Sequence, residues 1–186
     1  GRDVTGFPAH RLSALGLARS FQECRVLPEF TCMENLRFAR QSKGLARTLA
    51  QMLGRSRAED RATEAEARRL LDLVNLTSYA EAPASVLSFG QRRLLEIVCT
   101  FVMQPRVLLL DEPAAGVNPM LLETLTAALR AMYAERPGVF LVIEHNMDFI
   151  MSLADDIVVM HQGAVLERGS PAAVQASPRV IEAYLG

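Results

Sequence analysis

Two adjacent carboxylates, Asp111 and Glu112, stand where their residue type and position could support chemistry. They directly follow an unbroken apolar run over residues 107–110, which is typical of a strand buried on both faces. In open α/β sheets, ligands bind at the carboxyl ends of the strands. Acidic residues also often begin a surface loop, so the pair by itself indicates a candidate ligand site without deciding its function.

The segment just upstream predicts a helix whose start could bind an anion. Ser88 and Gln91 have the S-x-x-Q spacing of a capping box, in which two side chains satisfy N–H groups of the first turn. Gly90 lies inside that turn, where glycine weakens a helix but lets another group approach the main chain closely. An apolar stripe at helical spacing follows, and Gln104 and Pro105 end it. A helix N-terminus of this kind is a ready anion site.

These two segments together resemble the ATP-binding subunits of ABC transporters. Residues 87–91 read LSFGQ and match the signature motif, and residues 106–113 read RVLLLDEP and match the Walker B segment. The pair is highly specific in this order and spacing. The resemblance implies an α/β fold of the P-loop NTPase type, with a mainly parallel sheet and an inserted helical subdomain. Apolar strands that alternate with amphipathic helices favour the same fold class.

Further segments match the same family in the expected order. Residues 17–22 read LARSFQ and match the Q-loop, and residues 143–147 read IEHNM and match the H-loop. Residues 114–119 read AAGVNP and resemble the D-loop, with a helix start at the proline. Many ABC proteins carry aspartate where this chain has Asn118, and the form GVNP resembles the branched-chain amino acid importer group. The ending over residues 177–186, SPRVIEAYLG, resembles that group too.

The resemblance implies a role in ATP hydrolysis for residues of the Walker B segment, the Q-loop and the H-loop. Glu112 is implied to orient and polarise the attacking water, and Asp111 to hold Mg²⁺, commonly through water. Gln22 would complete the metal shell, and His145 would contact the γ-phosphate of ATP. Without the resemblance, a lone glutamine in a loop is most often solvated, and a lone histidine after a strand is usually structural. The implied reaction is phosphoryl transfer to water.

The signature residues are implied to act across a dimer. Ser88, Gly90 and Gln91 would bind ATP held by a second ATPase subunit, through the N–H groups of the helix that they open. We expect a heterodimer, because the importer group commonly pairs two different ATPase subunits. Closure of the dimer would move the helical subdomain and, through it, transmembrane permease subunits. A periplasmic or extracellular solute-binding protein would take part indirectly. The chain is expected to be cytoplasmic, at the inner face of the membrane.

Four segments follow from the motifs and the composition along the chain. Residues 1–22 are expected to be a core segment that ends in the Q-loop, and residues 23–86 a helical subdomain. Residues 87–170 would carry the signature and the catalytic α/β core. Residues 171–186 would form a C-terminal helical segment. Within the last part of the core, a hairpin is predicted over residues 156–167, with its turn at His161, Gln162 and Gly163.

The overall composition bounds the class of protein. A chain of 186 residues with 50% hydrophobic residues can bury a core as one domain with a small insertion. It has 20 basic and 21 acidic residues, which argues against a nucleic-acid surface. Its three cysteines are scattered without metal-ligand spacing, as in proteins of a reducing cytosol. No apolar run approaches the roughly 20 residues that span a bilayer.

One expected motif does not occur in these 186 residues. The pattern G-x-x-x-x-G-K-[ST], whose N–H groups and lysine cradle nucleotide phosphates, is absent from them. Residues 1–6 resemble the segment that follows the phosphate-binding helix in ABC ATPases. We therefore expect a truncated sequence, with a parent protein that hydrolyses ATP and a 186-residue piece that does not.

Several alternatives remain open at this level. A urea or other amide importer ATPase of the same group is one, because the solute is chosen by other subunits. A second is a catalytically silent ABC-like module that lacks the phosphate loop and serves in dimerisation or docking. A third, an ABC ATPase of DNA repair or translation, fits the balanced charge poorly.

Overall fold

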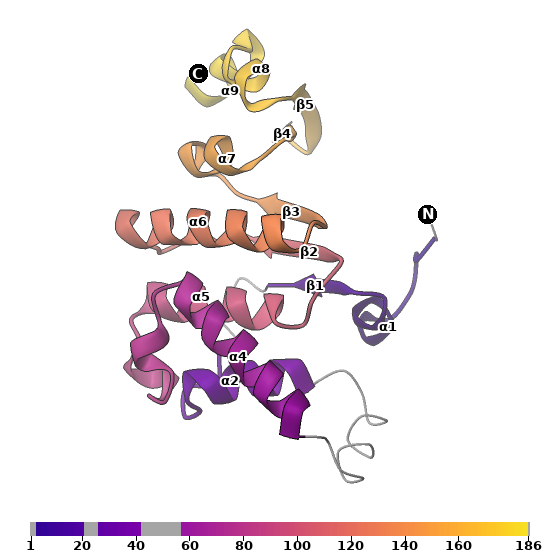
Figure 1. Cartoon of the computed structure of the whole chain (residues 1–186). Helices are drawn as coiled ribbons and strands as arrows, with labels where there is room; N and C mark the ends of the chain where they lie inside the picture. The colour runs from indigo at the N-terminus through magenta and orange to yellow at the C-terminus, as the bar shows by residue number, and fades with distance from the viewer. Residues whose placement is uncertain (1–2, 21–25, 42–56, 186) are drawn as a thin grey trace. The chain divides into compact units, whose positions relative to one another are not determined.

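The computed structural model of the chain describes residues 3–20, 26–41 and 57–185. The chain divides into two compact units, Gly1–Glu144 and His145–Gly186. The first unit has a three-stranded sheet and the second a two-stranded one, with helices in both (Figure 1). The α/β class predicted from the sequence is confirmed.

Three parallel strands form the sheet of the first unit. They are β1 (Leu17–Arg19), β2 (Val107–Asp111) and β3 (Val139–Ile143), in the spatial order β1-β2-β3. Leu17 and Val139 both lie opposite Val107 of the central strand. Because the strands are parallel, their carboxyl ends meet at one edge of the sheet, where β2 ends at Asp111. The predicted parallel sheet is thus confirmed, and it brings the ends of three distant segments together.

Two helices cover one face of this sheet. Helix α5 (Phe89–Phe101) precedes β2, and helix α6 (Pro119–Glu135) connects β2 to β3. The ring of Phe140 on β3 meets Phe101 of α5 and Tyr133 of α6 edge to face, with centroid distances of 6.4 and 5.5 Å. Leu108 and Leu110 on the same face of β2 are fully buried. This face is the core that positions the carboxyl end of β2.

The other face of β3 is largely exposed, although all five residues of the strand are apolar. Its three apolar side chains are 59, 55 and 60% exposed, in the order Val139, Leu141, Ile143. Residues on the same face of β2 are half-buried, so β2 is not buried on both sides either. An unbroken apolar run therefore overstated the burial, because helices α5 and α6 cover a single face.

The elements that the structure describes between β1 and α5 are all helical, joined by loops and turns. It contains α2 (Cys32–Gln41), α4 (Arg57–Leu73) and two short 3-10 turns, η1 (Thr77–Tyr79) and η2 (Ala84–Val86). Thr31 caps α2: its Oγ1 accepts from the N–H of Glu34 at 3.1 Å, and a Glu34 carboxylate oxygen accepts from the N–H of Thr31 at 2.8 Å. Before β1 lies the short helix α1 (Ala9–Ala14). The treatment of 23–86 as a subdomain of its own stays a prediction.

Ion pairs join helix α4 to the end of helix α6. Arg69 Nη1 lies 2.7 Å from Glu135 Oε2, and Arg136 Nη2 lies 3.1 Å from Glu66 Oε1. Arg69 also pairs with Glu66 at 3.0 Å. Burial alone raises the pKa of Glu66, but its hydrogen bond from Arg69 and the nearby arginine charges outweigh this and lower that pKa below its ordinary value. Glu66 is therefore held ionised between two helices.

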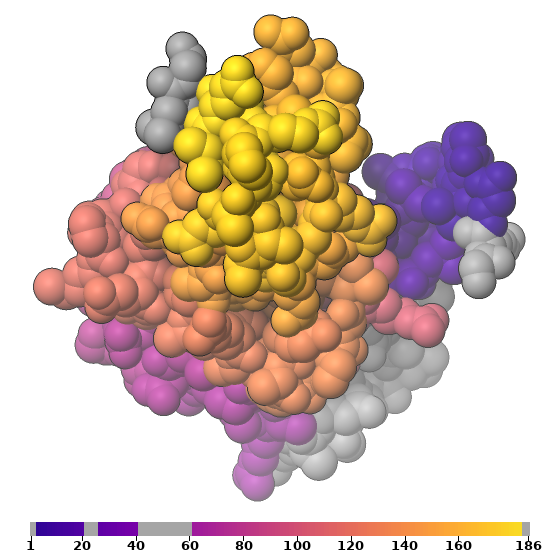
Figure 2. Space-filling model, turned by 90° about the horizontal axis from the view of Figure 1, so that it is seen from above, coloured from indigo at the N-terminus to yellow at the C-terminus, as the bar shows by residue number. Residues whose placement is uncertain are grey.

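The second unit is built on a hairpin with its own small core. Strands β4 (Ile157–His161) and β5 (Ala164–Gly169) are antiparallel, and helices α7 (Met147–Leu153), α8 (Pro171–Gln175) and α9 (Pro178–Leu185) accompany them. Gln162 and Gly163 both have positive φ at the turn, which confirms the predicted hairpin. The buried core consists of Ile157, Val159, Val174 and Val180. In Figure 2 the atoms of α8 and α9, in yellow, lie together at the surface. Across the described ranges, no helix has the length and apolar character needed to cross a bilayer.

Candidate functional site

The two carboxylates lie where β2 gives way to a tight turn. Asp111 is the last residue of β2, and Glu112 has a φ of +45°, in the left-handed region that non-glycine residues rarely adopt. That conformation costs about 1–2 kcal/mol, so other contacts must hold it. One such contact is a hydrogen bond of 2.8 Å from the N–H of Glu112 to the carbonyl of Ile143 on β3. Asp111 and Glu112 are both half-buried, so a small ligand can reach them.

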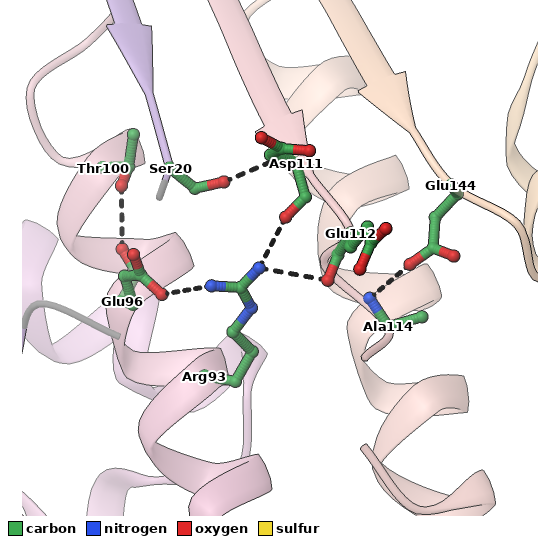
Figure 3. A network of polar contacts seen from close by, with 8 residues as sticks. All are labelled: Ser20, Arg93, Glu96, Thr100, Asp111, Glu112, Ala114 and Glu144. Atoms are coloured by element: carbon green, nitrogen blue, oxygen red, sulfur yellow. Dashed lines mark hydrogen bonds and ion pairs between the residues drawn. The ribbon is translucent and has the colours of Figure 1, made fainter. Parts of the chain in front are cut away.

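Arg93 of helix α5 binds the main chain of both carboxylate residues (Figure 3). Its Nη2 donates to the carbonyl oxygens of Asp111 at 2.7 Å and of Glu112 at 3.0 Å. Its Nη1 donates to Oε2 of Glu96 at 2.7 Å. The side chains of Arg93 and Glu96 are only 3 and 7% exposed. Burying an ion pair is costly unless further hydrogen bonds accompany it, and the two carbonyls supply acceptors for Arg93.

Two further side chains hold the same turn from other strands. The N–H of Ala114 donates to Oε1 of Glu144, directly after β3, at 2.7 Å. The N–H of Asp111 donates to Oγ of the buried Ser20, directly after β1, at 3.2 Å. Residues 111–114 are therefore fixed by contacts from α5, β1 and β3 together.

The carboxylate of Asp111 is paired with a cation from β1. Arg19 Nη2 lies 3.1 Å from Asp111 Oδ2, and the two side chains are 55 and 27% exposed. An exposed pair of this kind contributes little to stability, about 0–1 kcal/mol. The pair places a positive charge beside the carboxylate without burying either group.

The predicted capping box at the start of α5 is confirmed. The hydroxyl oxygen of Ser88 accepts from the N–H of Gln91 at 3.3 Å, and Oε1 of Gln91 accepts from the N–H of Ser88 at 2.9 Å. The first N–H groups of a helix have no partner within the helix, and these two bonds satisfy only part of that first turn. The remaining N–H groups there belong to Phe89 and Gly90.

The space around Gly90 is occupied by this chain's own side chain. A Cβ at Gly90 would lie 2.8 Å from Cδ1 of Leu121 on α6. At Gly116, where φ is +70°, a Cβ would lie 2.6 Å from the ring of Phe89. Close packing between the start of α5 and the loop before α6 thus explains both glycines. We expected Gly90 to let another group approach the main chain closely. The group that does so in this structure is the side chain of Leu121.

Helix α6 starts at Pro119, as the sequence predicts, and Asn118 is its N-cap. Its Oδ1 accepts from the N–H of Leu121 at 2.9 Å, and Pro119 is the first helical residue. Asn and Asp are equally good N-caps. The departure from aspartate at this position therefore leaves the helix start intact.

The structure does not bring every predicted site residue together. Gln22 lies outside the described residues. His145 is exposed, follows directly after Glu144 and begins the second unit, where Asn146 caps α7 by accepting from the N–H of Phe149 at 3.0 Å. The structure brings together the turn that carries Asp111 and Glu112 and helix α5, which begins at the signature residues.

A magnesium site at this turn would have to rest on few protein ligands. Among the residues that the structure describes, no group of three or more His, Cys, Asp or Glu side chains could hold a metal ion. Mg²⁺ commonly binds through one or two carboxylates while phosphate oxygens and water fill its other positions. A single half-buried carboxylate, Asp111, fits that pattern and does not fit a metal site made by protein alone.

Sequence reasoning missed the residues that fix the turn. Arg93, Glu96, Ser20 and Glu144 contact the carboxylate turn or each other, yet none was a predicted site residue. One signal was present: Arg93 and Glu96 stand three residues apart within an apolar helix. Opposite charges at that spacing lie on one helix face, and among apolar neighbours they indicate a buried pair.

The sequence matches known proteins along its whole length. The ABC transporter family matches residues 1–115, and the Branched-chain amino acid ATP-binding cassette transporter family matches residues 164–186. The high-affinity branched-chain amino acid transport ATP-binding protein BraF of Pseudomonas aeruginosa is 39% identical over 188 residues, which cover 100% of this chain and 74% of BraF. The corresponding protein LivG of Salmonella typhimurium is 36% identical over 192 residues, which cover 100% of this chain and 73% of LivG.

Solved structures agree with this assignment. Two structures of MJ1267, an ATP-binding cassette of an ABC transporter, match with TM-scores of 0.79 and 0.75 at 27% identity. They cover 100% of this chain, which corresponds to 75 and 74% of those chains. The P-loop NTPase-like fold expected from the signature and Walker B segments is confirmed. The chain belongs to the ATP-binding proteins of the ABC transporter family, in the branched-chain amino acid importer group.

Proposed function

We propose that this chain supplies the catalytic carboxylates of an ATPase subunit that powers import of branched-chain amino acids or related small solutes. The observation that carries the proposal is the turn after β2, where Asp111 and Glu112 are half-buried while their main chain is fixed. The solute follows the names of BraF and LivG, both of which are branched-chain amino acid transport proteins. A urea or amide importer of the same group is the alternative, since other subunits bind the solute.

Glu112 is the residue that would act on the attacking water. Hydrolysis of ATP is phosphoryl transfer to water, in which positioning and charge stabilisation dominate. A carboxylate oxygen of Glu112 would accept a hydrogen bond from the water and orient it. The fixed main chain at φ +45° supports this role, because it limits where that carboxylate can point.

Asp111 would hold Mg²⁺ at the end of β2. When bound, the ion would neutralise charge on the phosphate oxygens. Asp111 pairs with Arg19 at 3.1 Å, so a cation already lies beside this carboxylate. Gln22 stands three residues after the end of β1 in the sequence and would complete the metal shell.

The signature turn and His145 would contact the nucleotide phosphates. Ser88, Gly90 and Gln91 lie in the first turn of α5, where N–H groups favour an anion. They would bind ATP that a second ATPase subunit holds, in a dimer that we propose to be heteromeric. His145, two residues after the end of β3, would contact the γ-phosphate. A phosphate loop of the G-x-x-x-x-G-K-[ST] pattern is not among these 186 residues, so turnover is proposed for this chain together with such a loop.

The subunit would work at the inner face of the cell membrane. The relatives are named as transport proteins, which supports transmembrane permease subunits as partners and a solute-binding protein as an indirect one. Dimer closure would move the helical subdomain over residues 23–86 and, through it, the permease. Nucleic acid is not a proposed partner, because basic and acidic residues number 20 and 21.

Substitution of Glu112 tests the proposal. In the complete subunit, Glu112→Gln should lower ATP turnover by at least about 100-fold, the range of a lost general base, while ATP binding measured by titration calorimetry is retained. Glu123→Gln, on an exposed position of α6, is the matched control and should leave turnover unchanged. Near-normal turnover in Glu112→Gln would remove Glu112 from this role.

A further inference from the structure

We propose that Arg93 is a positioning residue that fixes the turn carrying Asp111 and Glu112 and so couples it to the signature helix. The inference rests on the proposed function for the identity of the reaction. Its structural part concerns the main chain of residues 111–114 alone.

Arg93 stands where an apolar residue would serve helix packing better. Its neighbours Leu94 and Leu95 are fully buried in α5, and Arg93 itself is only 2% exposed. Burying a charge is expensive unless it is paired and bonded. A guanidinium at this position therefore needs a specific reason, and its acceptors supply one.

The two carbonyls of the turn converge on one nitrogen. Arg93 Nη2 lies 2.7 Å from the carbonyl oxygen of Asp111 and 3.0 Å from that of Glu112. In an extended strand, successive carbonyls point to opposite sides, so both reach one donor only where the chain turns sharply. The φ of +45° at Glu112 provides that turn. The arginine and the left-handed residue thus belong to one arrangement.

Glu96 holds the guanidinium in place from the same helix. Its Oε2 accepts from Arg93 Nη1 at 2.7 Å, so the two terminal nitrogens of the guanidinium bind different partners (Figure 3). Arg93 also follows Gln91 of the capping box by only two residues. A movement of the signature turn along α5 would therefore reach the main chain of Glu112 through a single side chain.

A pair of variants separates positioning from simple stabilisation. Arg93→Met alone removes the cation that pairs with the buried Glu96 carboxylate, which is strongly destabilising, so this variant does not separate positioning from stability. Arg93→Met combined with Glu96→Leu removes both charges, which is often neutral for stability, yet it still removes the bonds to both carbonyls. Arg93→Lys keeps the charge and replaces the planar fork with a single ammonium group. Arg61→Met, at an exposed position of α4, is the control.

Two readouts in the complete subunit test the inference. The first is amide hydrogen exchange without nucleotide, where Arg93→Met/Glu96→Leu should speed exchange at the N–H groups of residues 112, 114 and 115 at least tenfold and leave residues 108–110 unchanged. The second is steady-state ATP hydrolysis, where the same variant should lower kcat at least tenfold with KM changed less than twofold. Arg93→Lys should fall between it and the wild type in both.

The outcomes are distinguishable from failure of the proposed function. Faster exchange across all of β2, or wild-type exchange at residues 112–115 in the double variant, would overturn the positioning role. A wild-type kcat in the double variant would overturn the coupling to catalysis. If Glu112→Gln hydrolyses ATP normally while the exchange result holds, the proposed role of Glu112 fails and the structural role of Arg93 stands.

Discussion

Replacing Gly116 by alanine tests the contact between the signature turn and the loop before α6. Gly116 has a φ of +70°, and a Cβ there would lie 2.6 Å from the ring of Phe89. The left-handed conformation costs an alanine about 1–2 kcal/mol. Forcing a methyl group into a packed contact costs about 1–3 kcal/mol more. We therefore expect Gly116→Ala to lower the free energy of unfolding by about 2–5 kcal/mol.

Gly6 provides the matched control for this estimate. It lies in the same unit with a φ of +75°, but a Cβ there would meet no atom within 4 Å. Gly6→Ala should therefore show only the conformational cost of about 1–2 kcal/mol. Urea denaturation followed by circular dichroism would measure both variants, and the difference between them reports the clash with Phe89.

A double-mutant cycle identifies the ring as the cause. Phe89→Ala in the Gly116→Ala background should recover the clash component, since the ring that the methyl group meets is gone. Equal destabilisation by Gly6→Ala and Gly116→Ala would refute the reasoning. It would mean that Phe89, which is 52% exposed, moves aside without cost.

Two further predictions concern an ion pair and the sheet. The pKa of Glu66 is lowered on folding, so its contribution to stability is fully present above its ordinary value near 4.5 and is lost as pH falls through the lower folded pKa. Urea titrations should show this acid-dependent loss in the wild type and a smaller one in Glu66→Gln. Leu108→Ala, at a fully buried position of β2, should cost about 2–5 kcal/mol. Leu141→Ala, at a 55% exposed position of β3, should cost less than about 1 kcal/mol, and equal losses at the two sites would contradict the one-sided sheet.

Local features of the fold could be predicted because their causes lie within a few residues. The capping box of Ser88 and Gln91 joins residues three apart, and Pro119 itself favours the helix start at which it lies. The turn at Gln162 and Gly163 needs only two residues with positive φ. In each case the interaction partners are neighbours in the sequence, so spacing and residue type are sufficient.

Features that depend on distant segments could not be predicted in the same way. The bond from Arg93 to the Glu112 carbonyl spans 19 residues, and that from Ala114 to Glu144 spans 30. Likewise, the exposure of Leu141 depends on which helices cover the sheet. No periodicity within a segment carries that information. The resemblance supplied the identity of Asp111 and Glu112 as site residues, and the structure supplies what holds them.

In the turn after β2, the main chain is held by hydrogen bonds while the side chains of Asp111 and Glu112 stay partly exposed. Its N–H groups and carbonyls are bonded to Ser20, Arg93, Ile143 and Glu144, which come from three different elements or their ends. The side chains of Asp111 and Glu112 stay half-buried at the sheet edge. A strained main chain persists only where surrounding contacts hold it in place. Such strain is usually found at functional sites. A turn that only connects β2 to α6 would not need a buried arginine, so the contact supports the proposed role of this turn in positioning two carboxylates.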